Sequence, residues 1–482
     1  MKKITRTERR AMIERGKTAA IIVLCLCCAF FLYSIWDLYK GQVSIGQAFW
    51  GTDSIPAANS AKTKDVVNSF KDFIEPEIVM VGQANNRAVL SPNEDLYTRA
   101  LIAINDVMKG VYETQAESFE MTDRDLWQNV ISNGIIYVKY PCVINTAFEK
   151  PFVVSGESGM AANIVKYEDV MIIPNPSADK GVTVFLKNMD TMQNFKVELT
   201  SSAVELRNII GEYRNKKNNS LLFAHELNLD VPRTDESGES AVVLDSMFII
   251  PLERAASANI VATVPRTYVQ GIDFSHTNDF TTGLLNVFGY NPNTVRQYAD
   301  RDGSVIFVGD TGSLSIHPGG RIEYKALGEN EGISFMTPGR VEADPRGVMS
   351  GINEIMEAVF SISGMDEEGT DAELRITEMP DMTNSGELKV CMDYFANSKR
   401  IMLGKGPAVE ARIKNGAMVE LKMIIKSVKT TNGITTNDDA FSAIDEFCEK
   451  NPKCKTIKRG SLVYKAFEDG KEASAKWQIQ GE

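Results

Sequence analysis

The pattern of hydrophobic and polar residues begins with one long apolar segment. Residues 19–36, AAIIVLCLCCAFFLYSIW, carry no charge and approach the length that a helix needs to cross a hydrocarbon layer of roughly 30 Å. The seventeen residues before position 18 contain 7 basic and 2 acidic side chains, which places the N-terminus in the cytoplasm by the positive-inside rule. We therefore predict a cytoplasmic tail over 1–17, a single transmembrane helix over 18–38 in the cell membrane, and a linker over 39–61 that leads to extracellular domains.

A cleaved secretory signal is the alternative interpretation, because a signal has the same order of basic and then apolar residues. The apolar run is longer than the roughly 7–15 residues of a signal. The bulky sequence after Trp36, DLYKGQVSIGQAFWG, also has no clear small-x-small cleavage site near the apolar run. Both observations favour an uncleaved anchor.

The rest of the chain mixes helical periodicity with the alternation typical of strands. Strand patterns joined by short turns predominate, which predicts α+β domains with antiparallel sheets. We predict a first domain over 62–150 and a second over 151–268. The region 269–482 shows the order of one helix and then hairpins twice, so we predict a third domain with a division into two subdomains near 330–345.

Four local patterns predict particular elements. A helix is expected over 62–74, and a longer one over 94–116, where apolar residues recur at helical spacing. A further helix is expected to begin after Thr122, whose hydroxyl suits an N-cap and which acidic residues follow. Asn415 and Gly416 separate two alternating runs and predict a tight hairpin turn.

Composition narrows the class of protein. The chain is 43% apolar and 24% charged, as globular proteins are, and its net charge of −12 argues against a nucleic-acid-binding surface. Without the first seventeen residues, 45 basic and 62 acidic residues remain, a net charge of −17, which anionic lipids and wall polymers repel. Three histidines are few for acid–base or metal chemistry, so we expect no enzyme, no metal site and no cofactor.

One motif nevertheless suggests catalysis. Ser177 and Lys180 have the Ser-x-x-Lys spacing of penicillin-binding proteins and β-lactamases. The chain lacks the Lys-Thr-Gly and Ser-Asp-Asn motifs of those enzymes, and the dipeptide Asn175-Pro176 predicts a turn before the serine. A serine–lysine hydrolase of the cell envelope therefore stays only as an alternative function, beside an envelope protein that binds peptide or glycan.

The histidines and acidic clusters do not form known metal motifs. His225 has no second histidine four residues later, so the zinc-protease motif fails, and His276 and His317 are expected at the surface. The acidic clusters 300–303 and 366–368 do not follow the EF-hand calcium loop. They are expected to be solvated turns.

Two groups of small residues are candidates for contacts, one with a partner helix and one within the chain as a disulfide. Cys25 and Ala29 lie one helical turn apart with Cys28 beside them, and such a stripe either packs on a partner helix or faces lipid. Cys448 and Cys454 are separated by five residues that include Asn451-Pro452. In an oxidising compartment these two form a disulfide or remain free thiols, and the sequence leaves both readings open.

Three stretches resemble a known family. They are WQNVISNGIIYVKYP over 127–141, GLLNVFGYNPNTVRQYADRDGSVIFVGDTGSLSIHPGGRIEYKA over 283–326, and SLVYKAFEDGKEASAKWQI over 461–479. The most specific positions of the middle stretch are Phe288, Tyr290, Asn291, Asp302, Gly303, Gly312, Leu314, Gly320 and Tyr324. With the basic start and the single span, the chain resembles the YycH family of two-component regulatory proteins in Gram-positive bacteria, and its last third is similar to the related YycI family.

This resemblance implies a membrane-anchored accessory protein without catalytic residues. Its partners would be a sensor histidine kinase of the YycG (WalK) type and a YycI-like membrane protein, and it would restrain kinase signalling for cell-wall homeostasis. The resemblance assigns the coupling to the transmembrane helix. We therefore expect a regulator that acts by protein–protein contacts.

Overall fold

The structure is a computed structural model of the whole chain, and it describes residues 73–482 with gaps. The gaps are 85, 93, 116–118, 123–124, 127–129, 155–163, 165, 189–192, 215–220, 233–241, 253, 255, 273–277, 330, 336–344, 381, 383–386 and 405. All described residues belong to one compact unit, Lys64–Glu482, and the other unit is Met1–Thr63. The predicted tail, transmembrane helix and linker, with Cys25, Cys28 and Ala29, lie outside the described residues and stay predictions. No helix within the described ranges is long and apolar enough to cross a membrane.

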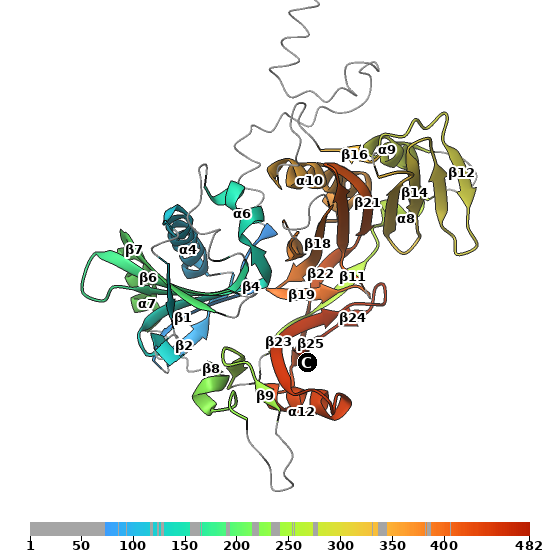
Figure 1. Cartoon of the computed structure of the whole chain (residues 1–482). Helices are drawn as coiled ribbons and strands as arrows, with labels where there is room; N and C mark the ends of the chain where they lie inside the picture. Colours follow the sequence, from blue (N-terminus) through green and yellow to red (C-terminus); the bar gives the residue numbers. More distant parts are fainter. Residues whose placement is uncertain are drawn as a thin grey trace, which may run out of the picture. The chain divides into compact units, whose positions relative to one another are not determined.

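A seven-stranded antiparallel sheet, the N-terminal sheet, forms the first part of this unit (Figure 1). Its strand order is β2-β1-β4-β5-β6-β7-β3. The strands are β1 (Ile78–Gln83), β2 (Asn86–Val89), β3 (Phe119–Thr122), β4 (Gly134–Asn145), β5 (Lys166–Pro174), β6 (Lys180–Asn188) and β7 (Asn194–Ser202). Strand β4 lies inside the sheet and pairs with both β1 and β5.

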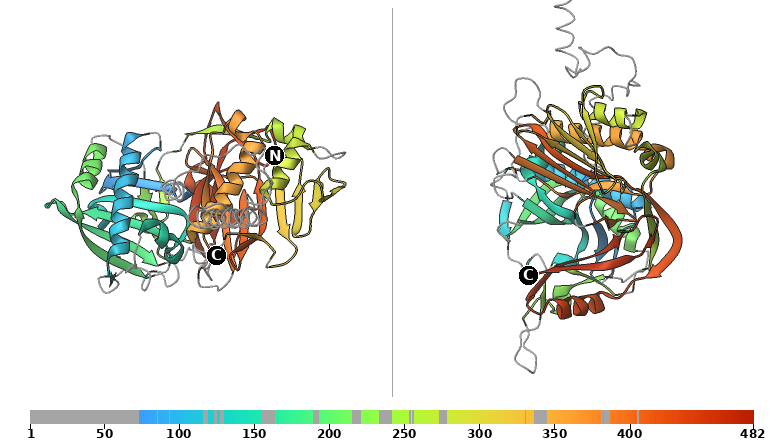
Figure 2. Two further views of the ribbon diagram at one scale, coloured as in Figure 1. Left: turned by 90° about the horizontal axis from the view of Figure 1, so that it is seen from above. Right: turned by 90° about the vertical axis from the view of Figure 1, so that its right-hand side faces the viewer.

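Both faces of the N-terminal sheet are covered, which explains why β4 reads as a nearly continuous apolar run. Helices α4 (Asp95–Glu113) and α7 (Val204–Arg214) lie side by side over one face (Figure 2). The other face packs against the hairpin of β8 (Leu221–Phe223) and β10 (Ile249–Pro251), where Tyr137 of β4 meets Phe223 edge to face.

A thirteen-stranded sheet, the C-terminal sheet, forms most of the remainder. Its main order is β12-β13-β14-β15-β21-β20-β18-β19-β23-β25, while β16, β17 and β9 pair with β21, β18 and β23. The strands are β9 (Val243–Leu244), β12 (Arg296–Ala299), β13 (Val305–Val308), β14 (Gly312–Ile316), β15 (Arg321–Ala326), β16 (Ile333–Ser334), β17 (Glu373–Glu378), β18 (Glu387–Ala396), β19 (Lys399–Met402), β20 (Val409–Lys414), β21 (Ala417–Ile424), β23 (Thr456–Lys465) and β25 (Ala475–Gly481). Its pairings are antiparallel except where β23 meets β19 and β9.

Short helices and a small sheet complete the unit. The helices are α6 (Thr146–Val153), α8 (Arg266–Gly271), α9 (Asp279–Val287), α10 (Pro345–Ile362), α11 (Met365–Glu368) and α12 (Ala440–Lys450). Strands β22 (Ser427–Thr436), β11 (Ala256–Thr263) and β24 (Glu472–Ala473) pair in that order. Helix α10 contacts α6, α9 and α11, so it packs against helices from both halves of the chain.

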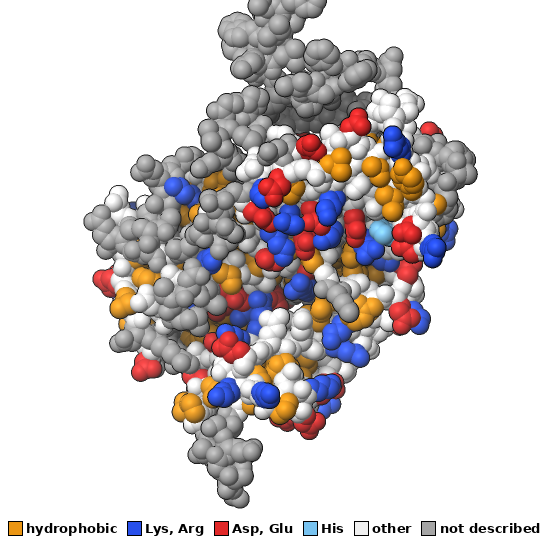
Figure 3. Space-filling view, turned by 45° about the vertical axis from the view of Figure 1, so that its right-hand side comes forward, with side chains coloured by type: hydrophobic (Ala, Val, Ile, Leu, Met, Phe, Trp, Pro, Cys, Tyr) orange, Lys and Arg blue, Asp and Glu red, His pale blue; other side chains and the backbone are white. Residues whose placement is uncertain are grey.

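The strands β18, β20 and β21 also carry cross-strand ion pairs at partly exposed positions. Arg412 pairs with Glu387 at 2.7 Å and with Glu420 at 2.9 Å, and Lys422 pairs with Glu420 at 3.0 Å. Exposed pairs of this kind contribute about 0–1 kcal/mol each. Acidic and basic side chains are interspersed on the face in Figure 3, so their charges largely cancel there.

The predicted domain boundaries do not match the strand pairing. Strands β4 and β5 lie on either side of residue 150 and are neighbours in one sheet. Strand β11, which was assigned to the second domain, pairs with β22 of the third. Strands β15 and β21 pair across 330–345, so the expected two subdomains share one sheet. These pairings join strands far apart in sequence, and one hydrophobic cluster runs through both large sheets.

The predictions of fold class and of single helices agree with the structure better than the predicted domain boundaries do. The mixed α+β class with antiparallel sheets is confirmed, and the helix expected over 94–116 is α4, Asp95–Glu113. Thr122 ends β3 and pairs with Asn194 of β7, residues 125 and 126 have helical backbone, and the start of the helix expected after Thr122 lies outside the described residues. The helix expected over 62–74 lies outside the described residues except for its end, where Phe73 has helical backbone.

The hairpin between β20 and β21 provides a test of the turn prediction. Asn415 and Gly416 have φ of 50° and 76°, as a type I′ turn requires at both central positions. We expect Gly416→Val to lower the free energy of unfolding by about 1–3 kcal/mol, because a β-branched residue is strained at this φ. Thermal unfolding of the purified protein measures this. The control is Gly319→Val, a turn position without positive φ and with open space around its Cα; equal losses in both variants would contradict the turn argument.

Candidate functional site

Two arginines from the C-terminal sheet hold the segment that leads into β1. This segment is Glu75, Pro76 and Glu77, and the arginines are Arg375 of β17 and Arg459 of β23. We call these five residues the arginine clamp. It lies close to Phe73, the residue at which the described part of the chain begins.

Arg375 contacts the segment through both terminal nitrogens. Its side chain is 1% exposed. Nη2 donates to Oε2 of Glu75 at 2.6 Å, and Nη1 donates to the carbonyl oxygen of Pro76 at 3.1 Å. Nε donates to Oε1 of Glu373 at 2.8 Å, and the guanidinium lies 5.2 Å from the ring centroid of Phe395. The backbone and one side chain of the segment are therefore fixed together.

Arg459 ties the same segment to the N-terminal sheet. It forms an ion pair with Glu77, and its Nη2 donates to the carbonyl oxygen of Tyr140 in β4 at 3.1 Å. Nη1 lies 2.8 Å from Oε1 of Glu168 in β5. Lys139 of β4 lies 3.6 Å from the same carboxylate. Arg459 thus joins β23 to the segment and to two strands of the N-terminal sheet.

Nearby carboxylates offset the cost of burying the charges of Arg459 and Lys139. Burial alone would lower the pKa of Arg459, but the carboxylates of Glu77 and Glu168 raise it above its ordinary value. Burial likewise opposes the charged form of Lys139, while Asp169 and Glu168 raise the pKa of Lys139 above its usual range. Both cations therefore stay charged inside the fold.

A buried cluster of this kind acts mainly as a constraint on geometry. Desolvation offsets much of the Coulomb attraction, so the net contribution of an intact buried pair to stability is small. Removing one partner costs about 3–5 kcal/mol, because the other charge is left buried and unpaired. The clamp therefore fixes the position of the incoming segment against both sheets.

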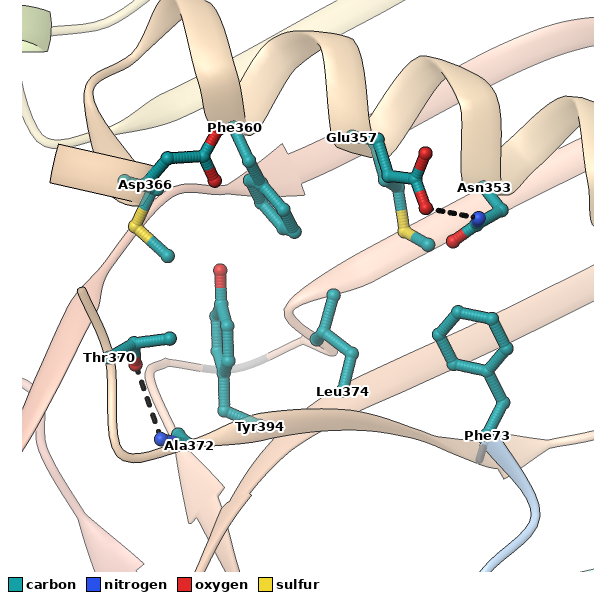
Figure 4. A pocket seen from close by; sticks show the side chains of 11 residues that line it. Phe73, Asn353, Glu357, Phe360, Asp366, Thr370, Ala372, Leu374 and Tyr394 are labelled. Atoms are coloured by element: carbon teal, nitrogen blue, oxygen red, sulfur yellow. Dashed lines mark hydrogen bonds between the residues drawn. The ribbon is translucent and has the colours of Figure 1, made fainter. Parts of the chain in front are cut away.

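A pocket of about 200 Å³ is lined in part by Phe73 and Leu374, which lie close to the clamp residues Glu75 and Arg375 in sequence (Figure 4). Helix α10 contributes Asn353, Glu357 and Phe360 to one side, and Leu374 and Tyr394 lie opposite. The other lining residues are Phe73, Met356, Met365, Asp366, Thr370 and Ala372. Most of the lining is apolar, and Phe73, the residue at which the described chain begins, is part of it.

The hydrolase residues are not arranged for catalysis. Ser177 is exposed in the turn between β5 and β6, and Oδ1 of Asn175 accepts a hydrogen bond from its backbone N–H at 2.9 Å. Lys180 is exposed at the start of β6. A serine nucleophile of this class needs the start of a helix in a cleft, whereas this serine lies in a surface turn, as its sequence context predicted.

The histidines and acidic clusters have ordinary partners where the structure describes them. Nδ1 of His225 lies 2.9 Å from the carbonyl oxygen of Ser246, and His317 lies 3.5 Å from Asp302. Glu368 accepts a hydrogen bond from a backbone N–H at the start of α8. His276 lies outside the described residues, and the described part of the chain contains no cluster of His, Cys, Asp or Glu suited to a metal.

Cys448 and Cys454 are free thiols in the structure, and both are half-buried. Sγ of Cys454 lies 3.4 Å from the carbonyl oxygen of Thr456. Burial raises the pKa of Cys448 above its ordinary value, and the neighbouring Cys454 adds to this. The disulfide between Cys448 and Cys454 stays a prediction.

The clamp was not predicted from the sequence. Arg375 and Arg459 lie in strands in which apolar and polar residues alternate, where a charged residue is normally taken to face water. Their partners lie 300 and 382 residues away. A Pro between two acidic residues just before a strand was the available local signal, and it specifies no partner.

Comparison with known proteins shows the fold. No family model and no curated protein matches the sequence. YycH from Bacillus subtilis, a solved structure, aligns with 86% of this chain and 96% of its own at a TM-score of 0.54 and 12% identity. The chain has the YycH fold. An uncharacterized protein from Eubacterium rectale aligns with 53% of this chain and 86% of its own, at a TM-score of 0.31 and 11% identity.

The YycH fold confirms the resemblance expected from the sequence at the level of architecture. At 12% identity the match shows the fold alone.

Arg459 is the residue on which the stability of the clamp depends most directly. We expect Arg459→Met to lower the free energy of unfolding by about 3 kcal/mol, because Glu77 and Glu168 then remain buried without a guanidinium. Their side chains are 13% and 10% exposed. Chemical denaturation of the purified protein measures the change.

The matched control is Arg412→Met, in which the lost ion pairs are exposed on the C-terminal sheet. It should cost no more than about 1 kcal/mol. Similar losses in the two variants would show that the clamp is no more important than a surface pair.

Proposed function

We propose that this protein is a single-pass, membrane-anchored accessory regulator of a sensor histidine kinase of the WalK (YycG) type, in a system that controls cell-wall homeostasis. It acts by protein–protein contacts, with the kinase and a YycI-like membrane protein as partners. Its tail lies in the cytoplasm and its folded domains lie outside the cell. The observation that carries the proposal is the YycH fold over 86% of the chain.

The arginine clamp suggests how such a regulator could couple its two parts. A shift of the membrane anchor reaches the folded unit through the residues just before Phe73. Because Arg375 and Arg459 fix Glu75 and Glu77 to both sheets, a shift that reaches this segment acts on both sheets together. The regulator would therefore transmit position between its outer domains and its membrane helix.

The alternative functions have less support. A serine–lysine hydrolase needs Ser177 in a cleft, and this residue lies in an exposed turn. For a protein that binds peptide or glycan, the sequence offers no discriminating residue.

Recovery of partners from membranes tests the function. The tagged full-length protein should co-purify with a sensor histidine kinase and a YycI-like protein, identified by mass spectrometry. If the stripe of Cys25, Cys28 and Ala29 packs on a partner helix, Ala29→Leu should prevent close approach and reduce recovery, because helices in lipid associate through small residues.

The control for this experiment is Ile22→Leu, which changes shape in the same helix without enlarging the stripe. Equal recovery of the kinase with both variants would assign the stripe to lipid contact. Absence of any kinase from the native preparation would contradict the proposed function itself.

A further inference from the structure

The pocket lined by α10 has aromatic side chains on two sides. Phe360 points into the space from α10, and Tyr394 of β18 and Phe73 lie opposite it (Figure 4). Tyr394 is buried, and its hydroxyl donates to the carbonyl oxygen of Ile424 at 3.1 Å, so the sheet holds this ring in place. The faces of aromatic rings carry partial negative charge and attract cations.

The lining also carries two exposed carboxylates, Glu357 of α10 and Asp366 of α11. Glu357 accepts a hydrogen bond from the side-chain amide of Asn353 at 2.7 Å. Among the described residues neither carboxylate forms an ion pair, and the lining contains no lysine or arginine. The pocket therefore combines aromatic rings with negative charge that the surrounding described residues leave uncompensated.

Basic residues close to the lining in sequence or in space have other partners. Arg375 of β17 pairs with Glu75 and Glu373. Lys429 of β22 lies 4.0 Å from Asp371. Because these cations already face other carboxylates, the acidic groups of the pocket remain available to a ligand.

The volume of the pocket limits the ligand to one small group. It is about 200 Å³, and a cavity of about 150 Å³ lined by apolar side chains accommodates benzene. A trimethylammonium group is comparable in size to benzene. It also loses less hydration on burial than a primary ammonium, which is a compact and strongly hydrated charge. Quaternary ammonium groups are therefore the cations that suit an aromatic pocket of this size.

We propose that this pocket binds a small quaternary ammonium ion of the choline class. Its methyl groups lie against Phe73, Phe360 and Tyr394, and its charge lies beside Glu357 and Asp366. The bound ion would contact α10 and α11 together. This inference rests on the proposed function for its biological meaning, as a ligand to which the outer domains of the regulator respond.

Ligand-observed NMR on the full-length protein tests the proposal without any kinase, so its failure would not bear on the proposed function. The protein is held in a maltoside detergent, which carries no ammonium group. Choline should bind at least about tenfold more tightly than dimethylbutanol, its uncharged carbon isostere, because only the cation is attracted by the rings and the carboxylates. Equal binding of the two compounds, or binding of neither, would overturn the proposal.

Glycerophosphocholine separates a free cation from a lipid headgroup as the source of the ammonium. It should bind more weakly than choline, because the carboxylates repel its phosphate. Tighter binding of glycerophosphocholine than of choline would assign the pocket to a lipid headgroup and would overturn the proposal of a free cation.

Substitutions in the lining test which side chains hold the ion. The double variant Glu357→Gln, Asp366→Asn should weaken choline about tenfold, and it should fold normally because both carboxylates are exposed. Phe360→Leu should weaken choline but not dimethylbutanol, because it keeps an apolar wall and removes the ring. The control is Glu354→Gln, on the same helix but outside the lining. The same affinity for choline in the double variant and in this control would overturn the proposal.

Discussion

The contacts of Arg375 and Arg459 with the segment Glu75–Glu77 constrain the rest of the structure. The Arg375 side chain is 1% exposed and that of Arg459 is 19% exposed, and each guanidinium has carboxylate partners from different parts of the chain. A buried charge that loses its partner is costly, whereas the intact cluster is close to neutral in energy. The clamp therefore selects one arrangement of the incoming chain and the two sheets, and adds little to the stability of that arrangement.

Both sheets contribute to the clamp and are packed against each other, so the position of the clamp is fixed relative to both. The N-terminal sheet is covered on both faces, and its interior strand β4 supplies the carbonyl oxygen of Tyr140 to Arg459. The C-terminal sheet supplies both arginines, and β17 lies against β4. A single hydrophobic cluster continues through both sheets. A displacement at the start of the described chain is thus shared by the whole unit, as the proposed relay of position to a membrane helix requires.

Local sequence patterns predicted local structure well. The apolar periodicity of α4 and the Asn415-Gly416 turn follow from interactions between near neighbours, and both are present. Domain boundaries were not predictable in the same way, because β11 pairs with a strand about 170 residues later and β4 with β5 across residue 150. The clamp is an extreme case, since Arg459 and Glu77 are separated by 382 residues. The sequence predicted the fold through the resemblance of three stretches to a known family. The residues of the candidate site come together only through tertiary contacts, so the sequence did not predict them.

Signalling output in cells tests the central claim most directly. The measurement is the activity of a reporter promoter under the response regulator of the kinase system, compared among cells with the native protein, without it, and with Arg459→Met or Arg412→Met at matched protein levels in the membrane. The account predicts that loss of the protein changes the output, that Arg459→Met shifts it toward the level of the strain without the protein, and that Arg412→Met leaves it at the native level. The same output with and without the protein would contradict the account.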